Sequence, residues 1–229
     1  MSDAPFRPFE TLIDEARALD LLRQATHGAE DGELFLERRR SEGIVLDDRR
    51  IRTASYDASE GFGLRAVVGE VAGYAHSTEI SESALRRAVE TARLAVGAGG
   101  GILAAPPKGT NLRLYTDADP MADASFAGKI DVLKEIDAYA RALDKRVVQV
   151  SATISAGLQE VEILRPEGLR LADVRPMARL NVSVIVEENG RREQGGTGGG
   201  GRYGLSRLIE PSHWQPMVRE ALRIAVVNL

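Results

Sequence analysis

The sequence predicts an α+β fold in which antiparallel β-sheets carry helices packed on one face. Short alternating segments follow one another without a helix between them, and each series of such segments is flanked by an amphipathic stretch of helical periodicity. A strict alternation of strands and helices, as parallel βαβ units require, is not present. Because the outline of helix, strands and turns occurs twice, we expect two α/β subdomains.

The first half is expected to begin with a helix over residues 11–25, where apolar residues recur at spacings of three and four. Between residues 33 and 76, short alternating runs separated by turn residues predict an antiparallel meander with a tight turn at 67–71. A second helix is expected to begin at Ser81, whose hydroxyl can accept from an early backbone N–H. The glycine-rich residues 97–101 are expected to end that helix.

The second half is expected to follow a linker, which Pro106 and its surroundings indicate. Apolar and polar residues then alternate most clearly over 148–156, which predicts a strand, and a change of phase predicts a bulge or bend at 157–160. Before this strand we expect a short strand at 111–115 and a helix at 126–144. After it we expect a turn at 165–168, strands at 169–174 and 180–188, and a closing helix at 211–227. These elements give an amino-terminal α+β subdomain over 1–105, a central α+β subdomain over 110–204 and a helical segment over 205–229.

Composition excludes several classes of function. The 229 residues carry a formal net charge of −4, so the chain has no general attraction for nucleic acid or for anionic lipid. No stretch has the length of a transmembrane helix. The absence of cysteine excludes disulfides, thiolate zinc sites and a cysteine nucleophile within this chain. We therefore expect a cytoplasmic protein without nucleic-acid or membrane partners.

The histidines do not form a recognisable metal motif. His27, His76 and His213 are far apart in the sequence, and none has a histidine partner one helical turn away, as a zincin-type site requires. A serine nucleophile in a Gly-x-Ser-x-Gly turn is also missing. We expect no metal ligand and no catalytic residue within this chain.

A glycine run at residues 195–201 is the most unusual feature of the sequence. It satisfies the dinucleotide-binding pattern only formally, because that pattern needs a βαβ context, and Arg202 follows where a phosphate-binding loop has Lys. We expect a flexible loop, or a backbone segment that a ligand or partner approaches closely. The candidate substrate- or partner-contact residues are Gly198, Gly199, Gly200, Gly201, Arg202 and Arg175.

Several segments resemble the TldD/PmbA family of zinc peptidases, which were once described as modulators of DNA gyrase. They are Gly61–Val67 with Gly69-Glu70 and Gly73-Tyr74-Ala75, Asp137–Arg141 with Asp144, Gly168 with Asp173–Pro176, and above all Arg191–Arg202. The resemblance spans nearly the whole chain, and its clearest segment, Arg191–Arg202, resembles the TldD branch more than the PmbA (TldE) branch.

The resemblance implies a cytoplasmic peptidase that cleaves unstructured peptides and pairs with a TldE-like subunit or with itself. It also implies a His-Glu-x-x-x-His zinc motif in a carboxy-terminal half that has no counterpart here. We therefore expect residues 205–229 to lead into a missing catalytic domain, and this chain to bind no zinc and to be inactive alone. Its role would be to shape the substrate cleft and the dimer contact, with open sheet edges that accept an extended peptide by strand addition.

Two alternatives remain. The chain is either the amino-terminal region of such a protease or a noncatalytic peptide-binding or assembly module that is complete as it stands. The closing helix reaches Leu229 without a cap, which favours the first interpretation. Nucleotide binding at the glycine run is a third and less favoured hypothesis.

Overall fold

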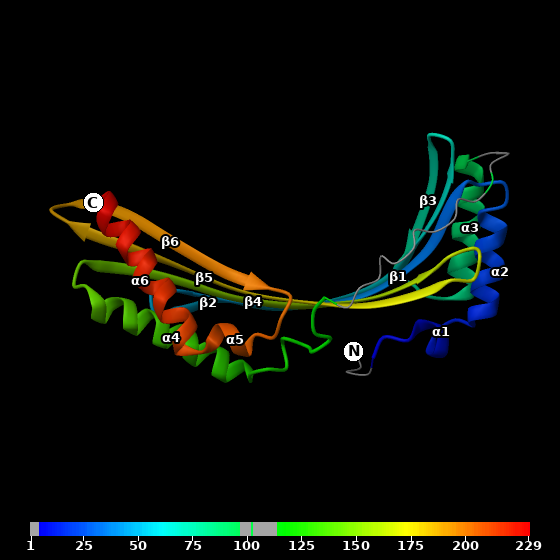
Figure 1. Ribbon diagram of the computed structural model, residues 1–229. Helices are drawn as coiled ribbons and strands as arrows, with labels where there is room; N and C mark the ends of the chain where they lie inside the picture. The colour runs from blue at the N-terminus through cyan, green and yellow to red at the C-terminus, as the bar shows by residue number, and fades with distance from the viewer. Residues whose placement is uncertain (1–4, 97–101, 103–113) are drawn as a thin grey trace. The chain divides into compact units, whose positions relative to one another are not determined.

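The computed structural model describes residues 5–96, 102 and 114–229 (Figure 1). The six strands form one sheet in the order β3-β2-β1-β4-β5-β6, and the pairs β2–β3 and β5–β6 are antiparallel. The predicted α+β class is therefore confirmed. The elements are α1 (Pro8–Thr11), α2 (Glu15–Ala25), β1 (Asp31–Asp47), β2 (Arg50–Val68), β3 (Val71–Ser77), α3 (Glu82–Val96), α4 (Phe126–Leu143), β4 (Val147–Leu164), β5 (Arg170–Glu188), β6 (Arg191–Gly201), α5 (Ser206–Ile209) and α6 (Pro211–Asn228).

The chain divides into two compact units that interleave along the sequence. The first takes in residues 1–39, 58–113 and 159–174, and the second takes in residues 40–57, 114–158 and 175–229. They interleave because β1, β2, β4 and β5 each contribute residues to both units. The sequence predicts successive segments separated by a linker instead, and most of that linker lies outside the described residues.

The first unit has a core formed by α2, α3 and the strand segments beside them. Leu21, Leu22 and Leu85 from the helices are fully buried with Leu34 and Leu64 from the sheet. Removing each such side chain from water contributes about 1.5–3 kcal/mol. This core is what the apolar stripes of the two helices predict.

The start of α2 differs from the sequence prediction. The helix begins at Glu15 and not at Thr11, and Pro8–Thr11 forms a separate single turn. Asp14 has extended backbone angles, and its carboxylate accepts a hydrogen bond from the Arg17 amide at 2.8 Å. The N-cap therefore interrupts a stripe of apolar residues that is continuous in the sequence. In α3, by contrast, the Ser81 hydroxyl accepts from the Ala84 amide at 3.2 Å, as predicted.

Several predicted short strands are wrong, because they merge into long ones. The alternating pattern was interrupted by charged residues that are in fact buried. Arg38 is 6 % exposed and pairs with Glu160 at 2.8 Å, and Arg40 is 7 % exposed and pairs with Asp119 at 3.0 Å. Since ion pairing makes burial of these arginines tolerable, β1 continues through them without a break.

The two predicted strands at 169–174 and 180–188 are likewise one strand, β5. In β4 the even-numbered positions stay buried from Val150 to Leu164, so the change of phase expected at 157–160 does not occur. Val161 is buried as well, which interrupts the alternation without shifting it. The predicted turns hold: Gly69 has φ +56° between β2 and β3, and Gly168 has φ +91° between β4 and β5. Of the strand predicted at 111–115, only Leu114 and Tyr115 are described, and neither lies in a strand.

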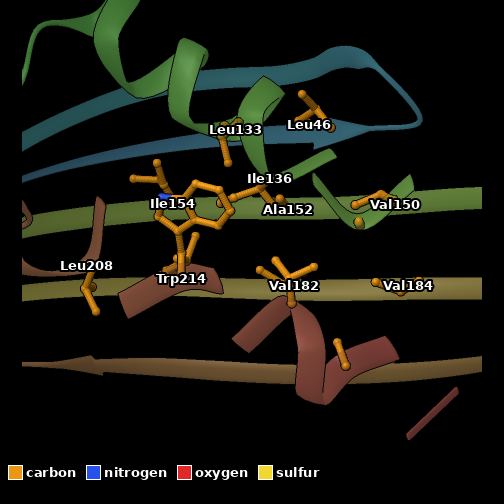
Figure 2. Close-up of a cluster of buried hydrophobic side chains, with 14 of the residues drawn as sticks. Leu46, Leu133, Ile136, Val150, Ala152, Ile154, Val182, Val184, Leu208 and Trp214 are labelled. Carbon is orange, nitrogen blue, oxygen red and sulfur yellow. The ribbon is translucent and has the colours of Figure 1, made fainter. Parts of the chain in front are cut away.

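The second unit has a core in which α4 and α6 cover one face of the strands (Figure 2). Ser125 caps α4 by accepting from the Gly128 amide at 3.1 Å. Trp214 of α6 is buried and meets the Tyr139 ring of α4 edge-to-face, with centroids 5.5 Å apart. Around them lie fully buried side chains from the helices and strands, among them Leu133, Ile136, Ile154 and Val182.

Candidate functional site

The glycine run forms the edge strand β6, so its prediction as a flexible loop is wrong. Every residue from Arg191 to Gly201 pairs with β5, beginning with Glu188 opposite Arg191 and ending with Ala178 opposite Gly201. Glycine alone costs backbone entropy in a strand. The ladder to β5 and the packing of α6 supply the order that the local sequence does not predict.

One face of β6 lies directly against α6, which Figure 1 shows in red along the orange strand. A Cβ at Gly195 would overlap the Ala221 carbonyl oxygen and lie 2.5 Å from the Ala225 amide nitrogen. The Thr197 hydroxyl on the same face donates to the Met217 carbonyl oxygen at 3.1 Å. The absence of a side chain at position 195 therefore lets the helix rest on the strand backbone.

The opposite face of β6 carries Gly196, Gly198 and Gly200. The Asn181 and Arg179 side chains of β5 lie across Gly198, where a Cβ would overlap the Asn181 side-chain oxygen. At Gly196 the nearest atom to a Cβ would be 3.5 Å away, so packing within the described residues leaves room for a side chain there. The open space on this face of β6 therefore lies above Gly196, whereas side chains of β5 lie over Gly198.

This surface forms an open hollow of about 380 Å³. The Gln194 amide nitrogen donates to the Ser183 hydroxyl at 2.7 Å, and the Arg179 Nε donates to the Asn181 side-chain oxygen at 2.9 Å. The lining offers donors and acceptors but no carboxylate or imidazole. It consists of Ser151, Thr153, Arg179, Asn181, Val182, Ser183, Gln194, Gly196, Thr197 and Gly198.

The structure separates the residues that the sequence grouped as contact candidates. Gly198 lines the hollow, whereas a Cβ at Gly199 would point toward Met217 of α6, 3.8 Å away. Arg202 stacks on the Tyr115 ring with its guanidinium carbon 5.1 Å from the centroid. Arg175 lies in β5, three residues before the one that pairs with Gly201, and is not part of the lining. Gly200 and Gly201 complete the strand.

Sequence reasoning did not select the polar residues of β4 and β5 that line the hollow. Ser151 and Thr153 occupy the odd-numbered positions of β4, and Asn181 and Ser183 occupy those of β5. A run of small hydroxyl and amide side chains on the face without helices was the available signal. Small polar residues on a strand ordinarily face solvent, so this pattern alone does not distinguish a binding surface from an exposed one.

The described residues do not fit a zinc site. Among residues 5–96, 102 and 114–229, no group of three or more His, Cys, Asp or Glu side chains is close enough to hold a metal ion. His27 and His76 are exposed, and His213 is half-buried in α6. Within the same residues, no helix is both long and apolar enough to cross a membrane.

Comparison with protein families matches two parts of the chain. Residues 32–96 match the profile described as PmbA/TldA metallopeptidase domain 1. Residues 119–229 match the profile described as PmbA/TldA metallopeptidase central domain. The two matches take in most of the chain and lie in the same order along it.

Three curated relatives are each described as a metalloprotease TldD homolog. The protein from Haemophilus influenzae is 35% identical over 204 residues, covering 86% of this chain and 42% of the relative. Those from two Buchnera aphidicola strains are 32% identical over 208 and 214 residues, covering 86% and 89% of this chain and 42% and 44% of the relatives. The chain therefore spans less than half the length of these relatives.

Solved structures share the fold at low identity. Two are described as modulators of DNA gyrase. The one from Bacteroides thetaiotaomicron has a TM-score of 0.70 and 18% identity, and the match covers 91% of this chain and 48% of that chain. The one from Thermotoga maritima has a TM-score of 0.72 and 14% identity, and the match covers 93% of this chain and 47% of that chain. TldE from Thermococcus kodakarensis has a TM-score of 0.68 and 16% identity, and the match covers 90% of this chain and 46% of that chain. Taken with the two family matches, these findings show that the chain belongs to the PmbA/TldD family.

Proposed function

We propose that this chain is the amino-terminal and central region of a TldD-type zinc metalloprotease that acts on unstructured peptides in the cytoplasm. Its part is to shape the substrate cleft and a dimer contact, with a TldE-like subunit or a second copy as partner. The zinc would be held by residues other than those described, and this chain alone is expected to cleave nothing. Family membership supports the peptidase class, and the edge strand β6 supports the peptide-binding role.

The observation that carries the peptide-binding proposal is a glycine-rich strand at the sheet edge. β6 is last in the strand order, so among the described residues no strand pairs with its outer side. An extended peptide can hydrogen-bond to such an edge through its main chain. Because main-chain bonds do not depend on side chains, binding of this kind tolerates many peptide sequences.

The hollow beside β6 provides a second set of contacts. Gly196 carries no side chain and the space above it is open, so a peptide can approach the sheet more closely there than over an ordinary strand. Asn181, Ser183 and Gln194 then present amide and hydroxyl groups that can bond to peptide carbonyls and amides. These groups bind and orient a polypeptide without contributing to bond cleavage.

The packing of α6 keeps this edge in place. Gly195 lies against the backbone of α6, and the Thr197 hydroxyl bonds to it. A strand held in its extended form before binding loses little conformational entropy when the peptide arrives. We therefore expect affinity for peptides to depend on α6 as well as on β6.

Peptides with methylated amides test strand addition directly. Two versions of one unstructured peptide would carry N-methyl groups on alternate residues, in opposite phase. Only one phase places the methyl groups on the edge that bonds to β6, so we expect one version to lose binding by about tenfold or more and the other to bind normally. Fluorescence anisotropy would measure both. Equal affinities would contradict strand addition.

A matched pair of substitutions locates the peptide. Gly196→Val places a side chain in the hollow, and it is expected to weaken peptide binding without unfolding the chain, since the space is open on that face. Gly199→Ala adds a methyl group on the helix side of the same strand, with the nearest atom 3.8 Å away. Equal effects of the two variants on affinity would place the peptide elsewhere.

A noncatalytic peptide-binding or assembly module is the second candidate. This candidate is supported by the lining of the hollow, which contains hydroxyl groups but no carboxylate or imidazole that could act as a general base beside them. The two candidates differ in cleavage by the whole natural protein. Peptide hydrolysis that stops when zinc is chelated supports the metalloprotease, whereas peptide binding without hydrolysis supports the module.

A further inference from the structure

The hollow beside β6 contains one charged group, the guanidinium of Arg179. The other residues that line it are neutral, and none of them is a carboxylate. All of them belong to the second compact unit, so the arrangement is set within that unit. The hollow is therefore a surface of hydrogen-bond donors and acceptors with a single positive charge.

Two glycines of β6 let the Arg179 side chain lie across that strand. In the ladder Arg179 pairs with Gly200, and Asn181 pairs with Gly198. A Cβ at Gly200 would lie 3.1 Å from the Arg179 Cβ, and a Cβ at Gly198 would lie 3.0 Å from the Arg179 Nη2. The guanidinium therefore lies over β6, one strand nearer to the sheet edge than the backbone that carries it.

Asn181 holds the guanidinium in this position without neutralising it. The Arg179 Nε donates to the Asn181 side-chain oxygen at 2.9 Å, and no carboxylate of the described residues pairs with Arg179. Arg192 offers a contrast, since the alternation of β6 places it on the same face. Its Nε donates to a Glu187 carboxylate oxygen at 2.6 Å. Of these two arginines, only Arg179 has a charge that a ligand can neutralise.

We propose that the hollow selects peptides with an acidic side chain, whose carboxylate bonds to Arg179 across Gly198. The inference rests on the proposed function, because it adds a side-chain preference to main-chain pairing along β6. A peptide strand on the edge would lie about 4.8 Å beyond β6. A side chain that it extends back over the sheet meets the guanidinium directly, since position 198 carries no side chain between them.

The free donors of Arg179 match a carboxylate in number and in plane. With Nε bonded to Asn181, the two terminal nitrogens carry four N–H donors that lie in one plane. A carboxylate can accept two parallel bonds from such a group, whereas a neutral amide offers a single acceptor oxygen. A lysine side chain at the same place would meet a like charge. The hollow therefore distinguishes glutamate or aspartate from glutamine and from lysine.

An acidic side chain within the peptide fits this position better than a carboxylate at the peptide end. The hollow is lined by β6 residues from Gln194 to Gly198, whereas the strand extends from Arg191 to Gly201. A peptide that pairs along the whole strand passes Gly198 with residues on both sides of it. The carboxylate that reaches Arg179 then belongs to an internal residue.

An exposed arginine that merely stays in solvent is the competing explanation. Exposed ion pairs are weak, because water screens them and long side chains lose rotamer freedom when they pair. Arg179 loses less of that freedom, since Asn181 and the glycines of β6 already fix its position. We therefore expect a moderate preference for acidic peptides, of about three- to fivefold in affinity.

Peptides that differ in one residue test the proposal on the full 229-residue chain. A neutral scaffold of serine and threonine would carry glutamate, glutamine or lysine at its centre, with both ends capped to remove terminal charges. Because the scaffold is uniform, the peptide can slide along β6 until the central residue reaches the hollow. Fluorescence anisotropy should show that the glutamate peptide binds about three- to fivefold more tightly than the glutamine peptide, and the lysine peptide least tightly.

Two variants of equal net charge locate the preference. Arg179→Gln should bind the glutamate and glutamine peptides equally, whereas Arg192→Gln should keep the preference, since Glu187 already occupies that guanidinium. Arg179→Glu should reverse the order and favour the lysine peptide. Circular dichroism would confirm that the variants, all at exposed positions, are folded.

The outcomes separate this inference from the proposed function. Equal binding of the glutamate and glutamine peptides to the unsubstituted chain overturns the inference and leaves main-chain pairing intact. A preference that both glutamine variants lose equally also overturns it, because net charge would then be the cause. So does an uncapped neutral peptide that binds as tightly as the glutamate peptide, since the hollow would then take a chain end. Failure of every peptide to bind counts against the proposed function itself.

Discussion

Among the residues that the structure describes, the sheet has two unlike free edges, β6 and the first part of β2. β6 contains glycine and uncharged residues from Gln194 to Gly201, and α6 covers one of its faces. The β2 edge is exposed on both faces and carries charges at its two ends. The two edges therefore share unpaired backbone groups but differ in side chains. In the proposed function it is the neutral glycine edge of β6 that accepts peptides of many sequences.

The turns that precede β6 and β2 also differ, in how well their residues tolerate a positive φ. The turn before β6 consists of Asn189 and Gly190, with φ 52° and 80°, which are residues that favour the left-handed region. The turn before β2 consists of Asp48 and Arg49, with φ 46° and 69°. Arginine adopts this conformation at a cost of about 1–2 kcal/mol. The β2 hairpin is therefore the more strained of the two.

The largest expected effect is on the covered face of β6. Gly195→Ala places a methyl group against the backbone of α6, so either the helix or the strand must shift. We expect the free energy of unfolding to fall by about 2–3 kcal/mol in urea denaturation. The control Ala54→Val enlarges an exposed residue of β2 and is expected to change stability by less than about 0.5 kcal/mol. Similar values for both variants would contradict the difference in packing.

A smaller effect is expected from one hydroxyl on each edge. Thr197→Val removes the hydrogen bond to the Met217 carbonyl and is expected to cost about 1 kcal/mol. Thr53→Val on the exposed β2 edge removes a solvated hydroxyl and is expected to be near neutral. Denaturant midpoints would report both. A neutral Thr197→Val would show that α6 is held by glycine packing alone.

The smallest effect is expected at the two turns, with opposite signs. Arg49→Gly relieves the left-handed arginine and is expected to raise the free energy of unfolding by about 0.5 kcal/mol, since part of the gain is lost to glycine flexibility. Gly190→Ala introduces the corresponding strain and is expected to lower it by a similar amount or slightly more. Thermal unfolding would compare the two variants, and a destabilising Arg49→Gly would contradict the assignment of strain.

Much of the fold could be predicted because its helices carry local signals. Ser81 predicts the helix that follows it, and the alternation over residues 148–156 predicts β4. The length of the strands could not be predicted, since Arg38 and Arg40 occupy buried positions through ion pairs with distant residues. Such ion pairs form only in the folded chain, so a local sequence pattern cannot predict them.

The site was predicted only in part for a similar reason. The glycine run was selected correctly as unusual, but its order depends on β5 and α6, which lie elsewhere in the sequence. Asn181 and Ser183 were missed because only the sheet brings them beside Gly196 and Gly198. A strand of glycines and a loop of glycines have the same local sequence, and only the neighbours distinguish them.

Hydrogen exchange of single backbone amides tests the central claim, that β6 is an ordered edge which accepts a peptide main chain. In the free chain, alternate amides of Arg191–Gly201 should be protected by β5, and the others should exchange quickly. Saturating peptide should slow the fast set and leave residues 50–61 of β2 unchanged. Fast exchange along all of β6, or protection by peptide at another place in the chain, would contradict the account.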